Sequence, residues 1–239
     1  MPLTPPRQSK YLKALQILRQ RPLKLWQYGR GYVLFQLSNL LRPLLLDNVR
    51  IHVANNVRIQ NLASFLAAGS DSLIEVGQDS IIYENAHIEV YGAGRLSIGA
   101  GSILGDVRIY CRNRVQLGER CLISWNVVIQ DYDPHPPAQQ LRRQQMQEMA
   151  RDFLPKFGSK IDVNKPNLGT PSKQLWEPPS APIEIGEDVW IGTGAIILKG
   201  AKIGTGSIIA AGSVVLGGEF PERSLIGGNP AKFIKVLPE

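Results

Sequence analysis

Residues 185–215 read, in groups of six, IGEDVW, IGTGAI, ILKGAK, IGTGSI and IAAGSV, followed by Val215. An aliphatic residue opens every group, and the fifth place holds only Val, Ala or Ser. A helix would bring apolar residues back every three to four positions, and a half-buried strand would do so every two. The strict period of six therefore excludes both as the organising element of this stretch.

Such a period is typical of a coil with short flat sides joined by corners. One large side chain from each side fills the interior, a small fifth residue fits near the corner, and glycine gives the backbone freedom to turn there. Less regular groups precede the stretch, opened by Val53, Ile59, Phe65, Val76, Ile82, Ile88, Leu117, Ile123 and Ile129. We therefore predict an all-β solenoid over residues 51–239, with a C-terminal cap over residues 217–239.

These groups of six resemble the hexapeptide-repeat acyltransferases, and the resemblance covers roughly residues 53–235. It implies a left-handed parallel β-helix, although parallel strands are generally joined by right-handed crossovers. Within the family, the segment Asp131-Tyr-Asp-Pro-His135-Pro resembles one in the sugar O-acetyltransferases, such as the galactoside and maltose acetyltransferases. Because one fold serves many functions, the repeats indicate the architecture more strongly than the reaction.

The spacing of the groups also predicts one long loop insertion. The step from Leu117 to Ile185 is 68 residues, which is 50 more than the 18 of a three-sided coil. We place the excess within residues 131–183, with a helix over Ala138–Leu154 and a proline-rich segment after it. Loops of this length in compact domains are usually functional or disordered. The resemblance implies a functional loop that covers the acceptor site of a neighbouring subunit, and a merely decorative insertion is the alternative.

Residues 1–50 are predicted to form a basic amphipathic helical arm ahead of the solenoid. Residues 1–46 hold eight lysines and arginines and no acidic residue, whereas the whole chain has a net charge of +7. We expect helices over residues 10–20 and 32–41. Such an arm suits an anionic membrane surface, and it also suits the open end of a solenoid, which needs a cap. The two roles do not exclude each other.

The sequence sets expectations about location and partners as well. It shows no signal peptide and no run of 18 apolar residues, so we expect a cytoplasmic protein, or one that contacts the inner face of the membrane through the arm. The basic charge lies on an arm with an apolar stripe and no recognised nucleic-acid motif. We therefore expect no nucleic-acid partner.

Metal chemistry has little support in the sequence. The two cysteines, Cys111 and Cys121, match no zinc spacing, and we expect packed, reduced thiols. A zinc-dependent carbonic anhydrase on this kind of solenoid would need three histidines around one metal ion. The chain has three, His52, His87 and His135, but they lie 35 and 48 residues apart, so no metal is expected.

His135 is the candidate catalytic base. It lies in the segment Asp131-Tyr-Asp133-Pro-His135-Pro, where the predicted loop leaves the coil, and function concentrates where a rigid scaffold meets a loop. Transfer of an acyl group to a hydroxyl or amine requires removal of a proton, which an imidazole accepts near neutral pH. A nearby carboxylate would fix the tautomer, and Asp131 and Asp133 are the local candidates. The resemblance assigns the catalytic role to His135 and implies Asp131 as its orienting partner.

Three residues near that segment are candidates for acceptor binding: Trp125, Asn126 and Asp133. In similar enzymes, polar side chains on these coils hold the acceptor sugar, which implies that role for Asn126. Asn is also common at corners because it tolerates left-handed backbone angles, so a purely structural role stays open. The ring of Trp125 suits stacking either on a sugar or on the loop.

The candidate donor site lies in the C-terminal coils. Small residues around Thr193 and Ala211 would let a ligand approach the backbone closely, although the repeat itself also requires small residues there. The resemblance implies that the pantetheine arm of acetyl-CoA lies along this edge between subunits and binds the backbone at Thr193 and Ala211. It also implies that Trp190 borders the groove. Lys232, in the sequence Gly-Gly-Asn-Pro-Ala-Lys, would then contact the nucleotide end as a point charge.

Together with the resemblance, these residues predict a homotrimer that transfers an acetyl group from acetyl-CoA to a hydroxyl of a sugar. His135 would deprotonate the hydroxyl, which would attack the thioester directly, and nothing in the sequence indicates an acyl-enzyme. The basic arm favours an acceptor in a surface polysaccharide or its lipid-linked precursor. N-acetylation of an amino sugar or a xenobiotic, and a non-catalytic scaffold, are the alternatives.

Overall fold

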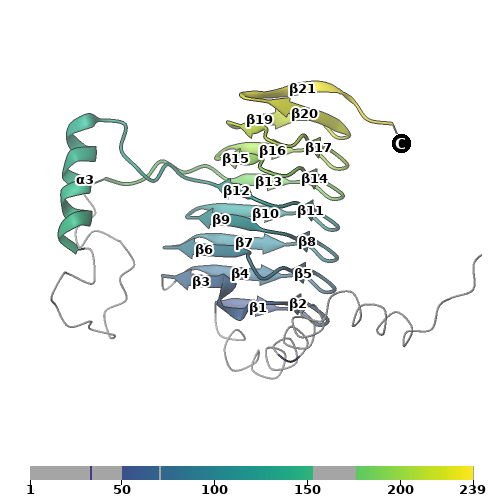
Figure 1. Cartoon of the computed structure of the whole chain (residues 1–239), viewed down its shortest axis with the longest axis horizontal. Helices are drawn as coiled ribbons and strands as arrows, with labels where there is room; N and C mark the ends of the chain where they lie inside the picture. Colours follow the sequence, from purple (N-terminus) through teal and green to yellow (C-terminus); the bar gives the residue numbers. More distant parts are fainter. Residues whose placement is uncertain (1–32, 34–49, 70, 153–175, 239) are drawn as a thin grey trace, which may run out of the picture.

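The computed structural model describes residues 33, 50–69, 71–152 and 176–238. Three sheets wind around one interior as a solenoid of about seven turns, which stack from β1 at one end to β21 at the other (Figure 1). Each turn adds one strand to each sheet, so strands that are neighbours in a sheet lie one coil apart in the sequence. The structure confirms the predicted all-β solenoid and is consistent with a left-handed parallel β-helix.

The first sheet contains β1 (Ile51–Val53), β4 (Leu73–Val76), β7 (Arg95–Ile98), β10 (Arg114–Leu117), β13 (Ile183–Ile185), β16 (Ala201–Ile203) and β19 (Gly218–Phe220). The second contains β2 (Arg58–Ile59), β5 (Ile81–Ile82), β8 (Ile103–Leu104), β11 (Leu122–Ile123), β14 (Trp190–Ile191), β17 (Ile208–Ile209), β20 (Ser224–Gly228) and β21 (Ala231–Val236). The third contains β3 (Phe65–Ala68), β6 (His87–Tyr91), β9 (Val107–Cys111), β12 (Val127–Gln130), β15 (Ile196–Leu198) and β18 (Val214–Val215). Between residues 50 and 152 the structure also contains η1 (Leu62–Ser64), a single 3-10 turn, and the helix α3 (Gln139–Asp152).

The C-terminal strand differs from the others in direction. Neighbouring strands of the coils pair in parallel, whereas β21 folds back antiparallel on β20. The hairpin lies at the end of the stack of coils (Figure 1). An open sheet edge would present unpaired backbone groups, and here the chain itself pairs the outer edge of β20.

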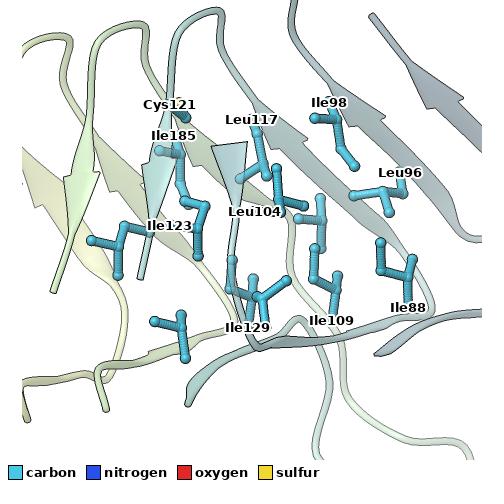
Figure 2. Packing of buried hydrophobic residues seen from close by; sticks show 14 of the residues in the cluster. Ile88, Leu96, Ile98, Leu104, Ile109, Leu117, Cys121, Ile123, Ile129 and Ile185 are labelled. Carbon is cyan, nitrogen blue, oxygen red and sulfur yellow. The ribbon is translucent and has the colours of Figure 1, made fainter. Parts of the chain in front are cut away.

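The residues that open the groups of six fill the interior. Those between Ile185 and Val215 are at most 3% exposed, and those predicted in the earlier coils are at most 9% exposed. Figure 2 shows how they stack: Ile88, Ile109 and Ile129 from three successive coils follow one another along one side. Burial of each of these aliphatic side chains stabilises the folded state by about 1.5–3 kcal/mol. Every coil is therefore held mainly by its own residues that open the groups of six.

Glycine after the opening residue has a different role from the one predicted. The φ angles of Gly118 and Gly186 are not positive. A Cβ on Gly118 would lie 2.5 Å from the carbonyl carbon of Gly186, so this glycine is needed because the coils approach closely. The freedom to turn is needed two places later, where Gly194 and Gly206 have φ angles of 72° and 70°.

Small residues at the fifth place join the coils through hydrogen bonds. The buried hydroxyl of Ser102 donates to the carbonyl of Gly118 (3.3 Å) and accepts from the amide of Cys121 (3.1 Å). Cys121 occupies the same place one coil later, and its thiol donates to the carbonyl of Gly186 (3.2 Å). These contacts satisfy polar groups that would otherwise be buried without partners.

The predicted N-terminal arm lies outside the described residues except for Val33 and Arg50. Val33, within the predicted helix over residues 32–41, is helical and exposed. In the part of the chain that the structure describes, no helix is long and apolar enough to cross a membrane.

Candidate active site

The two ends of the insertion pair with each other as an antiparallel neck, which we define as residues 131–133 and 179–181. The neck follows directly after β12 and leads into β13, and Figure 1 shows α3 projecting from the side of the solenoid. Two backbone hydrogen bonds of 2.9 and 3.0 Å and one bridge join its halves: Asp133 to Pro179, Ala181 to Asp131, and Tyr132 to Ser180. The neck therefore fixes the chain immediately before His135 to the solenoid.

Asp131 is fully buried, and its carboxylate serves the turn that joins β9 to β10. One oxygen accepts from the amide of Arg112 (2.8 Å), and the other accepts from the amide of Asn113 (2.9 Å) and the thiol of Cys111 (3.3 Å). Burial raises the pKa of this carboxyl, while the amide donors oppose the rise. The hydrogen bonds of this carboxylate lie in the preceding coil, and a different side chain holds the imidazole of His135.

Asp133 ties the neck to the coil that follows the insertion. Its two carboxylate oxygens lie 2.7 and 2.8 Å from Nζ of Lys199, which is in the turn after β15. Both side chains are partly exposed, so the pair contributes about 0–1 kcal/mol to stability and acts mainly on position. The pattern of the sequence does not single out Lys199, because a lysine at a repeat corner normally faces solvent.

His135 is exposed and lies between the neck and α3. Its Nδ1 is 2.9 Å from Oε1 of Gln145, and Nε2 of Gln145 donates to the carbonyl of Pro134 (3.2 Å). Arg142 donates from one guanidinium nitrogen to the carbonyls of Pro136 and Pro137, both at 2.9 Å. The first turns of α3 thus fold back on the prolines around His135, and the helix begins one residue after the predicted start at Ala138.

A second group of candidates forms a ridge at the corner between the second and third sheets. The ridge consists of Trp125, Thr193 and Ala211, which occupy the same place in three successive coils and are all exposed. The amide of Gly194 donates to the carbonyl of Trp125, and the amide of Gly212 to that of Thr193, both at 2.9 Å. Among the described residues, the amides of Thr193 and Ala211 donate no hydrogen bond to another backbone group.

The side chains around the ridge also have local partners. The ring of Trp125 packs against Tyr83, with centroids 5.9 Å apart. Asn126 has a φ of 57°, a left-handed corner conformation that accounts for asparagine without a ligand. Trp190 is 47% exposed, and its indole donates to the hydroxyl of Ser124 (3.2 Å). The acceptor-binding roles of Trp125 and Asn126 stay predictions.

Lys232 lies on the antiparallel hairpin that ends the solenoid. It is exposed in β21, opposite Gly227 of β20. In the described ranges it forms no ion pair, so its ammonium group is available to an anionic ligand. Its proposed contact with the nucleotide end of CoA stays a prediction.

The two groups of candidates lie at opposite ends of β12. Trp125 and Asn126 precede the strand, whereas Asp131 and the neck follow it. Four strand residues span about 13 Å, so β12 separates the ridge from the neck within one chain. The helix α3 stands off beyond the neck, to the side of the solenoid (Figure 1).

The remaining reactive side chains do not form a second centre. Burial raises the pKa of Cys121 to about 11 and that of Cys111 further, and a thiolate is the form that attacks acyl groups. Neither thiol is therefore a nucleophile near neutral pH. No cluster of three or more potential metal ligands occurs among the residues that the structure describes.

The buried position of Asp131 generates a prediction about stability. Asp131→Ala leaves the amides of Arg112 and Asn113 without their acceptor, so we expect the free energy of unfolding to fall by about 1–3 kcal/mol in a denaturant titration. The control Asp133→Ala removes a partly exposed ion pair and should cost at most about 1 kcal/mol. Wild-type stability of Asp131→Ala would contradict the structural role.

One stretch of the chain matches a known protein family, and the fold is similar to that of several solved structures. Residues 182–217 match the family described as "Bacterial transferase hexapeptide (six repeats)". Among solved structures, the polySia specific acetyltransferase NeuO is similar with a TM-score of 0.55 and 21% identity, covering 77% of this chain and 65% of that chain. The present chain thus spans slightly less than two thirds of the length of NeuO.

The N-acyltransferase AntD from Bacillus cereus gives matches over a larger share of its length. Its complex with dTDP and 3-hydroxybutyryl-CoA has a TM-score of 0.56 and 16% identity, covering 84% of this chain and 88% of that chain. A mutant in complex with dTDP-4-amino-4,6-dideoxyglucose and Coenzyme A has a TM-score of 0.57 and 16% identity, with 84% and 90% covered. At these identities the likeness shows a shared fold. Residues 182–217 therefore match the repeats of the bacterial hexapeptide transferases, and the chain shares its fold with solved acyltransferases.

Proposed function

We propose that this protein is an acyl-CoA-dependent O-acetyltransferase that moves an acetyl group onto a hydroxyl of a sugar. The observation that carries the proposal is the exposed imidazole of His135, held through one ring nitrogen where the insertion leaves the solenoid. NeuO is named as an acetyltransferase specific for polySia, and AntD was solved with acyl-CoA. These names favour an acyl-CoA donor and a carbohydrate acceptor for this chain as well.

In the proposed reaction, the free ring nitrogen of His135 takes the proton of the acceptor hydroxyl while the oxygen attacks the thioester carbonyl of acetyl-CoA. A C–O bond forms and the carbonyl oxygen becomes an oxyanion. The tetrahedral intermediate then collapses, the C–S bond breaks, and the CoA thiolate takes the proton from the imidazolium. The products are the acetyl ester and free CoA, and the raised pKa values of the two thiols support this direct route over an acyl-enzyme.

We place the donor along the ridge. The unbonded amides of Thr193 and Ala211 suit the carbonyl groups of a pantetheine arm, and the half-exposed ring of Trp190 would form a wall beside it. Lys232 would hold a phosphate of the nucleotide end as a point charge. A preorganised amide near the thioester would also stabilise the developing oxyanion.

We further propose that three copies assemble through the second sheet. One side chain per strand points outward from β5 to β20, and all six are apolar: Ile81, Ile103, Leu122, Trp190, Ile208 and Leu225. The corresponding outward column of the first sheet is polar: His52, Glu75, Ser97, Gln116, Glu184, Lys202 and Glu219. A continuous apolar column on one face is typical of an interaction surface.

Assembly would also complete the site. Within one chain, β12 separates the ridge from the neck, and α3 projects away from the solenoid (Figure 1). In a homotrimer, the insertion of one chain would meet the ridge of its neighbour, so that His135 and the donor come from different subunits. The basic charge of residues 1–46 favours an acceptor at the cytoplasmic face of a membrane, such as a surface polysaccharide or its lipid-linked precursor.

The reaction is tested by measuring release of CoA thiol from acetyl-CoA with two acceptors. Oligomers of polySia test O-transfer, and dTDP-4-amino-4,6-dideoxyglucose, the AntD ligand, tests N-transfer. His135→Ala should lower kcat by about 10²–10⁴-fold because it removes the base. The matched control, His87→Ala, changes an exposed histidine on β6 and should keep wild-type activity.

The outcomes separate the candidate functions. Near-wild-type transfer by His135→Ala would contradict the proposed base, whereas transfer only to the amino sugar nucleotide would favour an N-acyltransferase. A protein that neither binds CoA nor releases thiol with any acceptor would be a non-catalytic scaffold.

The assembly is tested by sedimentation equilibrium. The wild-type protein should sediment as a species of three times the 26.4 kDa chain mass. Leu122→Glu places a charge in the apolar column, next to Trp190, and should dissociate the trimer, whereas Gln116→Glu on the polar first sheet should not. A monomeric wild-type protein, or a trimeric Leu122→Glu variant, would refute this interface.

A further inference from the structure

The side chain of Gln145 contacts two groups in the segment that carries His135. Its Oε1 lies 2.9 Å from Nδ1 of His135, and its Nε2 donates to the carbonyl oxygen of Pro134 at 3.2 Å. A carbonyl oxygen only accepts, so the amide nitrogen of Gln145 must face Pro134 and the amide oxygen must face the imidazole. The second contact therefore fixes the orientation of an amide whose nitrogen and oxygen are otherwise interchangeable.

An amide oxygen cannot donate, so Nδ1 of the neutral ring must carry the proton in this contact. We infer that Gln145 is a positioning residue that holds His135 in the Nδ1–H tautomer and leaves the lone pair of Nε2 for the acceptor. A free neutral imidazole favours the Nε2–H tautomer. The hydrogen bond to Gln145 therefore sets the fraction of protein molecules in which Nε2 can accept a proton. The assignment of the tautomer follows from the two hydrogen bonds of Gln145, whereas its role in catalysis rests on the proposed function.

A neutral orienting group has a consequence that a carboxylate would not have. The negative charge of an Asp or Glu at this place would stabilise the imidazolium. The ring would then stay protonated, and unable to act as a base, up to a higher pH. The carboxylates of the neck have other partners: Asp131 accepts from backbone amides and a thiol, and Asp133 pairs with Lys199. Gln145 thus orients the ring without adding an anionic partner.

The positioning device is local to the start of the insertion. Gln145 is half-buried, whereas its neighbours Gln144 and Met146 on α3 are exposed. Among the described residues, the charged side chain of Arg142 also contacts this segment, and it binds the carbonyls of Pro136 and Pro137 rather than the imidazole. All these contacts lie within residues 134–145, so the tautomer is set before any neighbouring subunit contributes.

The first test is a long-range ¹H–¹⁵N correlation spectrum of the full chain with ¹⁵N-labelled histidine, recorded at a pH where the rings are neutral. The chain has three histidines, and loss of one signal set in His135→Gln assigns that of His135. The wild-type protein should show the Nδ1–H pattern. Gln145→Leu should shift His135 toward Nε2–H, whereas Gln144→Leu, the adjacent exposed position, should leave it unchanged.

A second variant separates orientation from charge. Gln145→Glu keeps an oxygen opposite Nδ1 and should keep the Nδ1–H tautomer of the neutral ring. Its added charge should move the onset of carbethoxylation of His135 by diethyl pyrocarbonate to higher pH by about one unit, as read by mass spectrometry. Gln144→Glu adds the same charge at the exposed neighbour and should shift the onset much less.

An Nε2–H pattern in the wild-type protein, or an unchanged Nδ1–H pattern in Gln145→Leu, would overturn the inference. Retention of wild-type circular dichroism by each variant excludes loss of α3 as the cause. The spectrum requires neither CoA nor an acceptor, so its result is independent of the reaction. A protein with the Nδ1–H pattern and no acetyl-CoA binding would lose the proposed function and keep the assigned tautomer.

Discussion

The close approach of successive coils is the constraint on which the rest of the structure depends. A Cβ on Gly99 or Gly204 would lie 2.4 Å from backbone atoms of the next coil, so glycine is required at these corners. Each coil then fixes the register of the next through backbone hydrogen bonds, and one large side chain from each side fills the interior. This packing leaves the outer faces of the sheets, and the places where the chain can leave the stack, free of that constraint.

The close approach of the coils also limits where candidate functional groups can lie. The ridge repeats one backbone arrangement, and the amides of Thr193 and Ala211, which donate no backbone hydrogen bond among the described residues, occupy the same place in successive coils. An insertion fits only where both of its ends return to adjacent coils, which the neck achieves between β12 and β13. Buried Asp131 and the ion pair of Asp133 with Lys199 fix the neck to the solenoid, and His135 lies two residues after the neck.

The sequence predicted the features that depend on a regular spacing of apolar residues. The buried openers, the coil boundaries around residues 131–183 and the helix α3 all follow from spacings of six or of three to four residues. Contacts between side chains carry no such signal: Lys199 meets Asp133 across 66 residues, and Gln145 of α3 reaches His135 across 10 residues. The sequence alone leaves two roles open for Asp131. An aspartate close to a histidine can orient the imidazole, and it can also be a buried acceptor for backbone amides.

The central claim is that an acyl-CoA binds along the ridge and reacts with an acceptor activated by His135. Calorimetric titration of acetyl-CoA into the wild-type protein and into Lys232→Ala tests it most directly, because it requires no knowledge of the acceptor. The account predicts micromolar binding at one site per chain, weakened at least about tenfold by loss of the lysine charge. Absence of heat, together with absence of protection from thermal unfolding by CoA, would contradict the account.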